Sequence, residues 1–495
     1  MTKDKNIQAT FPTHYGVYYG GGWHDSVEGM GFDTINPANG EVIARVVDAG
    51  RTEVDRAVEA AYDGYMIWRD VVPLERARIM RAAADIFRRH ADELALIESV
   101  NGGNPVSETK LDVMTAATSW DFFAGLVTEL KGSSIPMGPQ SINFSVREPR
   151  GVVLRIAPFN HPFLFSAGRL AAPLAAGNSV VVKPPEQAPL SALRMAELID
   201  GLFPPGVINV VPGQRETGAA LVAHKRVAMV SLTGSVATGK AVMREAASSL
   251  KPVLLELGGK NALIAYEDVD PTIAASAIVR GMNFTWSGQS CGSTSRAFVH
   301  RDIYDEVLRL IPQYVKAHVP GIPSDPKTTM GAICSKAQHA KVLGFIRAGI
   351  DDGARLLTGG NAPTNPELAS GFFIEPTVFV DVKQSMRIAR EEIFGPVVSI
   401  LPWSNEEEMF ADVNSVDYGL TCSIWTDRLE RAHSAAKRVE AGFVWINEVG
   451  KHFLGAPFGG YKQSGIGREE CFDELVSYSQ EKHVHVNIAN RVSSR

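Results

Sequence analysis

The stretch from Ser179 to Val211, SVVVKPPEQAPLSALRMAELIDGLFPPGVINVV, decides the fold class. The apolar run over 179–183 predicts a buried strand, and the helical spacing over 190–199 predicts a helix. A second apolar run over 207–211 predicts another strand. A helix between two buried strands is the pattern of a parallel sheet that is covered by helices on both faces.

The same alternation continues on both sides of this stretch. Downstream, helices are expected near 216–223 and 236–249, and strands over 227–232 and 253–257. Upstream, helical spacing predicts two amphipathic helices, over 52–68 and from about 74 to 100. A second α/β stretch runs from about 262 to 443. The predicted fold class is therefore α/β, in more than one domain.

Size and composition exclude several classes of protein. The chain has 495 residues, which fits two or three domains. Its net charge of -6 and the lack of a basic run argue against nucleic acid as a partner. Without a signal-peptide core or eighteen consecutive apolar residues, we expect no membrane association and a cytoplasmic location. Its 4 cysteines form no CxxC pair, so neither a metal site nor disulfides are expected.

One glycine-containing segment has the position of a phosphate-binding turn. Residues 234–239, GSVATG, lie between a predicted strand and a predicted helix, where backbone N–H groups and the helix dipole would hold a phosphate. A plain strand-to-helix turn is the alternative. Ala241 stands where a triphosphate-binding loop needs a hydroxyl for magnesium, and the dinucleotide fingerprint GxGxxG is absent.

Several polar residues stand where a reaction needs them. Cys291 lies in the Gly- and Ser-rich segment FTWSGQSCGSTSR, so it is either a working thiol or an inert core residue. Glu256 ends a predicted strand and is either a base or a charge at a turn. Asn160 lies between two prolines, as a rigidly held donor or a cap. Lys183 and Glu186 follow a strand at the edge where such sheets bind nucleotides.

Seven ordered motifs resemble the aldehyde dehydrogenase superfamily: PFN at 158–160, VKPPE at 182–186, TGS at 233–235, LELGGK at 255–260, GQSCGS at 288–293, EEIFGPV at 391–397 and PFGGYKQSGIGRE at 457–469. The resemblance extends from Ile35-Asn36-Pro37 to about Glu469. It implies a variant Rossmann cofactor domain at 1–127 and 150–259 and an α/β catalytic domain at 260–474. A β oligomerisation arm is implied at 128–149 and 475–495, in a homodimer or homotetramer.

The resemblance also implies a reaction. Cys291 attacks an aldehyde to give a hemithioacetal, whose oxyanion receives hydrogen bonds from the Asn160 side chain and the Cys291 backbone N–H. Glu256 then activates the water that hydrolyses the thioester, and Lys183 belongs to the catalytic set. The implied function is oxidation of an aldehyde to the carboxylic acid with reduction of NAD. Glu256 favours release of a free acid; a coenzyme-A-acylating semialdehyde dehydrogenase and a non-catalytic homologue are the alternatives.

The motifs assign cofactor positions as well. Lys183 and Glu186 are matched to the adenosine ribose, and Glu392 and Phe394 to the nicotinamide side. The glycine-containing turn, through Gly234, Ser235 and Gly239, is matched to the pyrophosphate. Because a carboxylate at 186 accepts ribose hydroxyls and repels a 2′-phosphate, NAD is preferred, although members of this family with such a glutamate also use NADP.

The substrate pocket is the least motif-like part of the chain. Spacing from the motifs suggests as lining His161, Phe165, Gly168, Trp286, Ser290 and His452. Gly168 stands where many relatives carry a bulky aromatic residue, so a roomy pocket is expected. An aromatic aldehyde is therefore favoured, with a semialdehyde next. The two histidines would face a polar tail or serve the structure.

Overall fold

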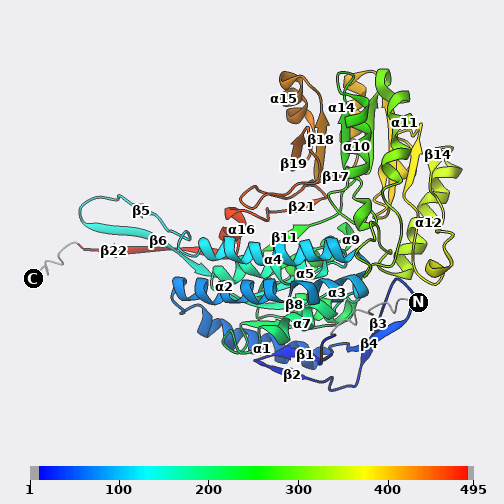
Figure 1. Cartoon of the computed structure of the whole chain (residues 1–495). Helices are drawn as coiled ribbons and strands as arrows, with labels where there is room; N and C mark the ends of the chain where they lie inside the picture. The colour runs from blue at the N-terminus through cyan, green and yellow to red at the C-terminus, as the bar shows by residue number, and fades with distance from the viewer. Residues whose placement is uncertain (1–10, 489–495) are drawn as a thin grey trace, which may run out of the picture.

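The computed structural model describes residues 11–488, and two large sheets organise this part of the chain (Figure 1). The first is 8-stranded, in the order β2-β1-β9-β8-β7-β10-β11-β21. Its strands are β1 (Val17–Tyr19), β2 (Gly22–His24), β7 (Val152–Ile156), β8 (Ser179–Lys183), β9 (Ile208–Val210), β10 (Val227–Thr233), β11 (Val253–Glu256) and β21 (Gly465–Ile466).

The five central strands of this sheet, β9-β8-β7-β10-β11, run parallel. Every residue of β8 is buried, which explains why its sequence is a continuous apolar run rather than an alternating one. The chain passes from β7 outward to β9 and then returns to the other side of β7 as β10. Such a reversal opens a crevice at the carboxyl ends of the strands, where ligands bind in open α/β sheets.

Helices cover both faces of the first sheet. One face packs against α1 (Arg51–Trp68), α8 (Arg215–Ala223) and α9 (Val236–Ala247). The other packs against a larger group, whose members are α2 (Pro73–Arg89), α3 (Ala91–Gly102), α4 (Val106–Gly125), α5 (Pro162–Ser166), α6 (Ala171–Ala175), α7 (Leu190–Leu198) and α16 (Phe472–Ser477), with the 3₁₀ turn η1 (Gly168–Leu170). The predicted α/β class is confirmed.

The second sheet is 7-stranded, in the order β14-β15-β16-β13-β12-β18-β19, and only β14 runs antiparallel to its neighbour. Its strands are β12 (Ala262–Ala265), β13 (Arg296–His300), β14 (Arg355–Thr358), β15 (Thr377–Val380), β16 (Val397–Trp403), β18 (Thr421–Trp425) and β19 (Phe443–Ile446). Its helices are α10 (Pro271–Gly281), α11 (Arg301–Val315), α12 (Lys336–Asp351), α13 (Arg387–Arg390), α14 (Glu406–Asn414) and α15 (Leu429–Arg438), and short turns are η2 (Phe284–Trp286) and η3 (Pro366–Leu368).

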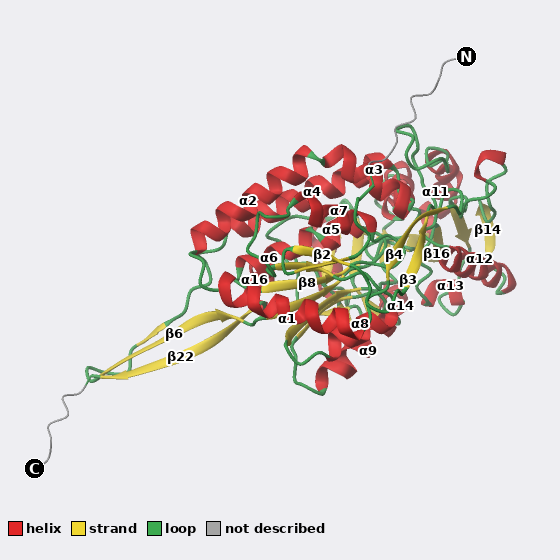
Figure 2. Ribbon diagram, turned by 90° about the horizontal axis from the view of Figure 1, so that it is seen from below, coloured by secondary structure: helices red, strands yellow, loops and turns green. Residues whose placement is uncertain are grey.

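A three-stranded ribbon projects from the body in both views (Figures 1 and 2). It consists of β5 (Ser134–Ile135), β6 (Ser141–Pro149) and β22 (Ser479–Asn487), and β22 pairs with β6 along its whole length. Two small pairs complete the fold, β3 (Gly31–Ile35) with β4 (Val42–Val47), and β17 (Tyr418–Gly419) with β20 (Tyr461–Lys462). The parts of the predicted cofactor domain and arm at 1–10 and 489–495 lie outside the described residues.

The long helix predicted from about 74 to 100 is wrong, because it is two helices. His90 has φ -103° and ψ 17°, and it separates α2 from α3. His90 is the N-cap residue of the second helix, where its carbonyl accepts the Leu94 N–H, and its Nδ1 lies 2.8 Å from Glu93 Oε2. Among residues 11–488 no helix is both long and apolar enough to cross a bilayer.

Candidate active site

The carboxyl ends of the central strands bring four sequence-predicted residues to one crevice. Lys183 is the last residue of β8 and Glu256 the last of β11. Asn160 follows the end of β7, and Gly234 directly follows β10. These strands are neighbours in the sheet, so residues far apart in sequence meet at its edge.

A cavity of about 290 Å³ lies at this edge. Its walls include nine of the predicted catalytic and cofactor residues, namely Asn160, Lys183, Glu186, Gly234, Ser235, Glu256, Cys291, Glu392 and Phe394. The cavity therefore gathers groups from both large sheets, because Cys291 precedes β13 of the second sheet and Glu392 precedes β16.

The described part of the chain contains four free cysteines. Three of them are buried, and only Cys291 is partly exposed. Its carbonyl accepts a hydrogen bond of 2.6 Å from the Asn261 Nδ2. Removal from bulk water, with the negative charges of Glu256 and Glu392, raises the pKa of the Cys291 thiol to about 12. The thiol is thus protonated in the protein alone, and a positive charge beside it would favour the thiolate.

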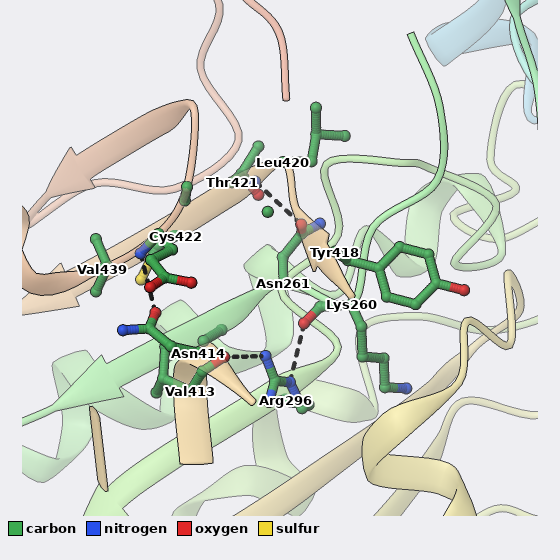
Figure 3. Close-up of a pocket in the computed structure, with 14 residues that line it drawn as sticks. Lys260, Asn261, Arg296, Val413, Asn414, Tyr418, Leu420, Thr421, Cys422 and Val439 are labelled. Carbon is green, nitrogen blue, oxygen red and sulfur yellow. Dashed lines mark hydrogen bonds between the residues drawn. The ribbon is translucent and has the colours of Figure 1, made fainter. Parts of the chain in front are cut away.

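Hydrogen bonds from the second sheet hold the Lys260-Asn261 segment (Figure 3). Asn261 in turn donates to the Cys291 carbonyl. The buried Arg296 guanidinium donates to the Lys260 carbonyl at 2.9 Å, and it also bonds backbone carbonyls at the end of α14. The Thr421 N–H donates to Asn261 Oδ1 at 3.0 Å. The backbone that carries Cys291 is therefore held by a buried network of hydrogen bonds, in which both the nitrogen and the oxygen of the Asn261 side chain are bonded.

Glu256 is buried, and neither of its carboxyl oxygens has a hydrogen-bond partner within residues 11–488. The backbone at Gly459 covers it closely, since a Cβ there would lie 2.8 Å from Glu256 Oε1. Burial and the nearby Glu469 carboxylate raise the pKa of Glu256 well above its ordinary value, against the opposing charges of Arg169 and Arg468. An unpartnered buried carboxyl in a reactive cavity is free to bond a water or a substrate.

Glu469 belongs to a buried ion network next to Glu256. The Arg155 Nη1 lies 2.9 Å from Glu469 Oε1, and the Arg169 Nε lies 3.2 Å from Glu469 Oε2. Arg155 also donates to Ser231 and Thr233 of β10, so the network is tied to the central sheet.

The part of the cavity beside β8 is polar and firmly held. Burial lowers the pKa of Lys183, against the charges of Glu186 and Asp48, and its Nζ donates to the Pro184 carbonyl at 3.2 Å. The Gln187 Nε2 donates to Glu186 Oε1 at 3.2 Å. An ammonium and a carboxylate thus face the same space.

The opposite wall is formed by Glu392 and Phe394. The Gly259 N–H donates to Glu392 Oε1 at 2.9 Å, and burial raises the pKa of Glu392. Phe394 has a positive φ of 57° and its ring lies 5.6 Å from the ring of Phe159, edge to face.

Among the wall residues that were not predicted, Gln338 and Lys341 on α12 lie far from any motif. The Gln338 Nε2 donates to the carbonyls of Ile393 at 3.1 Å and Phe394 at 2.7 Å, so it fixes the opposite wall. Lys341 lies close enough to Glu392 for the two charges to interact. No motif surrounds these residues, and helical spacing alone does not say which cavity a helix faces.

Two predicted glycines do not serve the purposes expected of them. Gly239 is absent from the cavity wall; a Cβ there would lie 2.6 Å from Leu257 Cδ1, so this glycine allows α9 to approach the sheet. Gly168 does not widen a pocket, because a Cβ there would lie 3.2 Å from both the Ala116 Cα and the Leu164 Cδ1. The space that its missing side chain leaves is filled by α4.

The remaining predicted pocket residues lie in three places outside this cavity. The His161 ring lies 3.9 Å from that of Trp286 and 5.9 Å from that of Phe165, between centroids. His452 instead lies against Phe458, with ring centroids 4.5 Å apart. Ser290 lines a small separate cavity that Glu392 and Phe394 also line.

Comparisons with known proteins agree with this architecture. Residues 23–484 match the model of the aldehyde dehydrogenase family. Aldehyde dehydrogenase tropH of Talaromyces stipitatus is 50% identical over 499 aligned residues, covering 99% of this chain and 97% of that protein. The chain therefore belongs to the aldehyde dehydrogenase family of oxidoreductases, and the predicted family, fold and enzyme class are confirmed.

Solved structures give the same result. A variant of the aldehyde dehydrogenase from Bacillus cereus is 38% identical, with a TM-score of 0.93 and coverage of 96% of this chain and 97% of that one. PnpE from Pseudomonas sp. WBC-3 is 38% identical, with a TM-score of 0.93 and coverage of 96% and 98%. Structures of the Bacillus cereus enzyme and of PnpE have been solved as complexes with NAD.

Proposed function

We propose that the protein oxidises an aldehyde to the free carboxylic acid with NAD, through a thioester on Cys291. The observation that carries this proposal is the single cavity that contains a thiol, an amide donor and an unpartnered carboxyl, namely Cys291, Asn160 and Glu256. These are a nucleophile, an oxyanion donor and a general base, which together suffice for acyl formation and hydrolysis.

The cavity fits NAD in its donors and acceptors. Glu186 offers a carboxylate to ribose hydroxyls beside the Lys183 ammonium, and Ser235 begins α9 with its N-terminus at the cavity. Glu392 offers a second carboxylate for the other ribose. The negative charge at 186 supports NAD over NADP, and NAD complexes of two relatives support the same choice. When bound, the nicotinamide ring accepts the hydride that leaves the substrate carbon.

The first half of the reaction, attack on the aldehyde, depends on Cys291 and Asn160. The Cys291 thiol first loses its proton to solvent water, which can reach this partly exposed residue. The thiolate sulfur then attacks the aldehyde carbon, and the aldehyde oxygen becomes an oxyanion. The Asn160 side chain and the Cys291 backbone N–H donate hydrogen bonds to that oxyanion. Asn160 is held for this role, because the buried Asn104 Nδ2 donates to the Asn160 carbonyl at 2.9 Å.

The second half of the reaction, hydrolysis of the thioester, depends on Glu256. Its carboxylate takes a proton from a water, and the resulting hydroxide attacks the thioester carbonyl and expels the Cys291 thiolate. The raised pKa of Glu256 makes the ionised carboxylate a stronger base than an exposed one. Release of a free acid, rather than transfer to coenzyme A, follows from a base that is free to bond water.

The domain division proposed from the sequence is supported by the two separate sheets, each with its own core. Residues 465–477 depart from the proposed boundaries, because β21 pairs with β11 and α16 packs on α6, both in the first half. The ribbon of β5, β6 and β22 has the shape of an arm, and its free edges need a partner strand, which supports a homodimer or homotetramer.

The experiment is NADH formation by the purified protein with aromatic, aliphatic, amino and ω-carboxy aldehydes. NAD and NADP are compared, with and without coenzyme A. Cys291→Ala is expected to lose at least about a thousandfold in kcat. Cys422→Ala, which removes a buried thiol in β18, is the matched control and should keep activity. Turnover that requires coenzyme A would overturn hydrolysis, and activity retained by Cys291→Ala would overturn the thioester.

A further inference from the structure

Two histidines in the structure share one arrangement of their ring nitrogens. His161 Nδ1 lies 2.8 Å from Asp112 Oδ2, and His452 Nδ1 lies 3.2 Å from Glu470 Oε2. In a neutral imidazole the nitrogen that faces a carboxylate carries the hydrogen and donates it, which leaves Nε2 as an acceptor. Neither Nε2 has a hydrogen-bond partner in the part of the chain that the structure describes.

Both imidazoles lie on aromatic surfaces. The His161 ring rests on Trp286 at 3.9 Å between centroids, with Phe165 beside it. The His452 ring lies 4.5 Å from Phe458. Each histidine therefore places a hydrogen-bond acceptor beside flat aromatic rings, and a polar group in an aromatic wall is the usual composition of a specific ligand pocket.

Residues of both walls are close in sequence to the proposed catalytic groups or to the backbone that covers them. His161 directly follows Asn160, and Trp286 lies in the same segment as Cys291. Phe458 directly precedes Gly459, whose backbone covers Glu256.

The walls are also joined to each other. The Arg169 guanidinium lies 5.7 Å above the Phe165 ring, and its Nη2 donates to Glu470 Oε1 at 2.6 Å. Although burial raises the pKa of Glu470, the charge of Arg169 and the hydrogen bond from His452 lower it to about 2, so Glu470 stays ionised and continues to accept the His452 hydrogen bond.

We propose that the substrate is a phenolic aromatic aldehyde, whose ring lies between these walls and whose hydroxyl donates to the Nε2 of His161 or His452. This inference rests on the proposed function. The flat walls fit an aromatic ring, and the acceptors need a donor. The carboxylates of Asp112 and Glu470 stand behind the acceptors and repel an anionic tail, which disfavours a carboxylated semialdehyde.

The first test compares each hydroxybenzaldehyde with the methoxybenzaldehyde of the same substitution. At a pH where the phenol is neutral, the two oxygen substituents have similar electronic effects on the formyl group, but only the hydroxyl can donate a hydrogen bond. At least one hydroxy isomer is expected to exceed its methoxy counterpart about five- to tenfold in kcat/KM. Equal values for every pair, or a higher kcat/KM for an ω-carboxy or ω-amino aliphatic aldehyde, would overturn the inference and leave the proposed function standing.

The second test assigns the acceptor. His161→Phe and His452→Phe keep an aromatic ring and remove Nε2, so one of them should reduce the hydroxy-to-methoxy ratio to about one. The matched control is His90→Phe, which removes an imidazole held by Glu93 in the same way but at the junction of α2 and α3. A ratio unchanged in both site variants would refute the assignment. Failure of the wild-type protein to oxidise any aldehyde would instead refute the proposed function.

Discussion

The backbone of Gly258 lies directly against the carboxylate of Glu392, so that a Cβ at 258 would lie 2.2 Å from Glu392 Oε2. Gly258→Ala must therefore displace Glu392 from the position in which Gly259 holds it. Overpacking of this kind costs about 1–3 kcal/mol, so we expect the KM for NAD to rise about tenfold or more. Initial rates at varied NAD concentration measure this.

Gly344→Ala is the matched control for that change. Gly344 lies on α12, on the same helix as Gln338 and Lys341, but a Cβ there would have nothing within 4 Å. The KM for NAD should stay unchanged, and the helix should gain about 0.5–1 kcal/mol in stability. A KM for NAD that stays at the wild-type value in Gly258→Ala would show that Glu392 does not hold the cofactor.

Replacement of the proposed base should separate the two halves of the reaction. In Glu256→Gln the thiol still attacks and the substrate is still oxidised, but no carboxylate activates water. We expect one burst of NADH of about one equivalent per active site, followed by a steady rate at least about a hundredfold below wild type. Intact-protein mass spectrometry should find the acyl group on Cys291. A normal steady rate would exclude Glu256 as the base.

The pH dependence of hydrolysis should follow the raised pKa of Glu256. Because the base acts only when it has lost its proton, the hydrolysis rate should increase with pH through a pKa well above that of an exposed glutamate. Glu469→Gln removes the negative charge that raises this pKa, so the profile should move to lower pH. Glu481→Gln, on the exposed arm, is the control. Single-turnover decay of the acyl-enzyme against pH gives the profiles, and identical ones would contradict the assignment.

Lys260 should make stability depend on pH. Its Nζ has no partner within residues 11–488, and burial with the nearby Arg296 charge lowers its pKa from 10.5 to about 7. Between pH 10.5 and about 7, Lys260 binds its proton more tightly in the unfolded chain than in the folded one. The free energy of unfolding therefore decreases as the pH falls through this range. Lys260→Met should therefore raise the thermal midpoint most near neutral pH and progressively less toward about pH 10. An increment that is constant with pH would disprove this.

The arm offers a test of assembly. Ile142 and Val486 lie directly opposite each other on β6 and β22, and both are exposed in the single chain. If this face binds another subunit, Ile142→Lys with Val486→Lys buries two unpaired charges and should dissociate the oligomer. Leu250→Lys replaces a residue that is 90% exposed elsewhere and should not. Light scattering after size exclusion gives the masses, and an unchanged mass in the double variant would place the interface elsewhere.

Strands and motif residues were predictable from the sequence for a physical reason. A strand with both faces covered must be apolar throughout, so β8 appears in the sequence at its observed bounds, 179–183. The residues that follow such strands necessarily meet at one edge of the sheet. Local sequence therefore places Lys183 and Glu256 at that edge, whereas the role of each, and that of Asn160, is inferred from the family motifs.

The rest depends on packing between elements distant in sequence. Gln338 and Lys341 reach the cavity because α12 packs beside it, and no neighbouring residue in the sequence indicates that contact. Gly168 illustrates the opposite error, a residue that was predicted to line a pocket and does not widen one. A missing side chain leaves room for a ligand only if no neighbour takes the space, and Ala116 of α4 does so. The junction at His90 escaped notice because the apolar spacing continues across it.

The pairing of β21 with β11 also determines how late in synthesis the first sheet can be completed. The Ser464 Oγ donates to the Gly258 carbonyl across 206 residues, and the whole second sheet lies between them. While that intervening chain is being translated, the edge of the first sheet at β11 stays open and Glu256 lacks the backbone that covers it. Such late, long-range pairing slows folding and leaves an exposed strand edge in the nascent chain. The active site is therefore completed only after residues 459–466 have been synthesised, when the whole second sheet has already left the ribosome's catalytic centre.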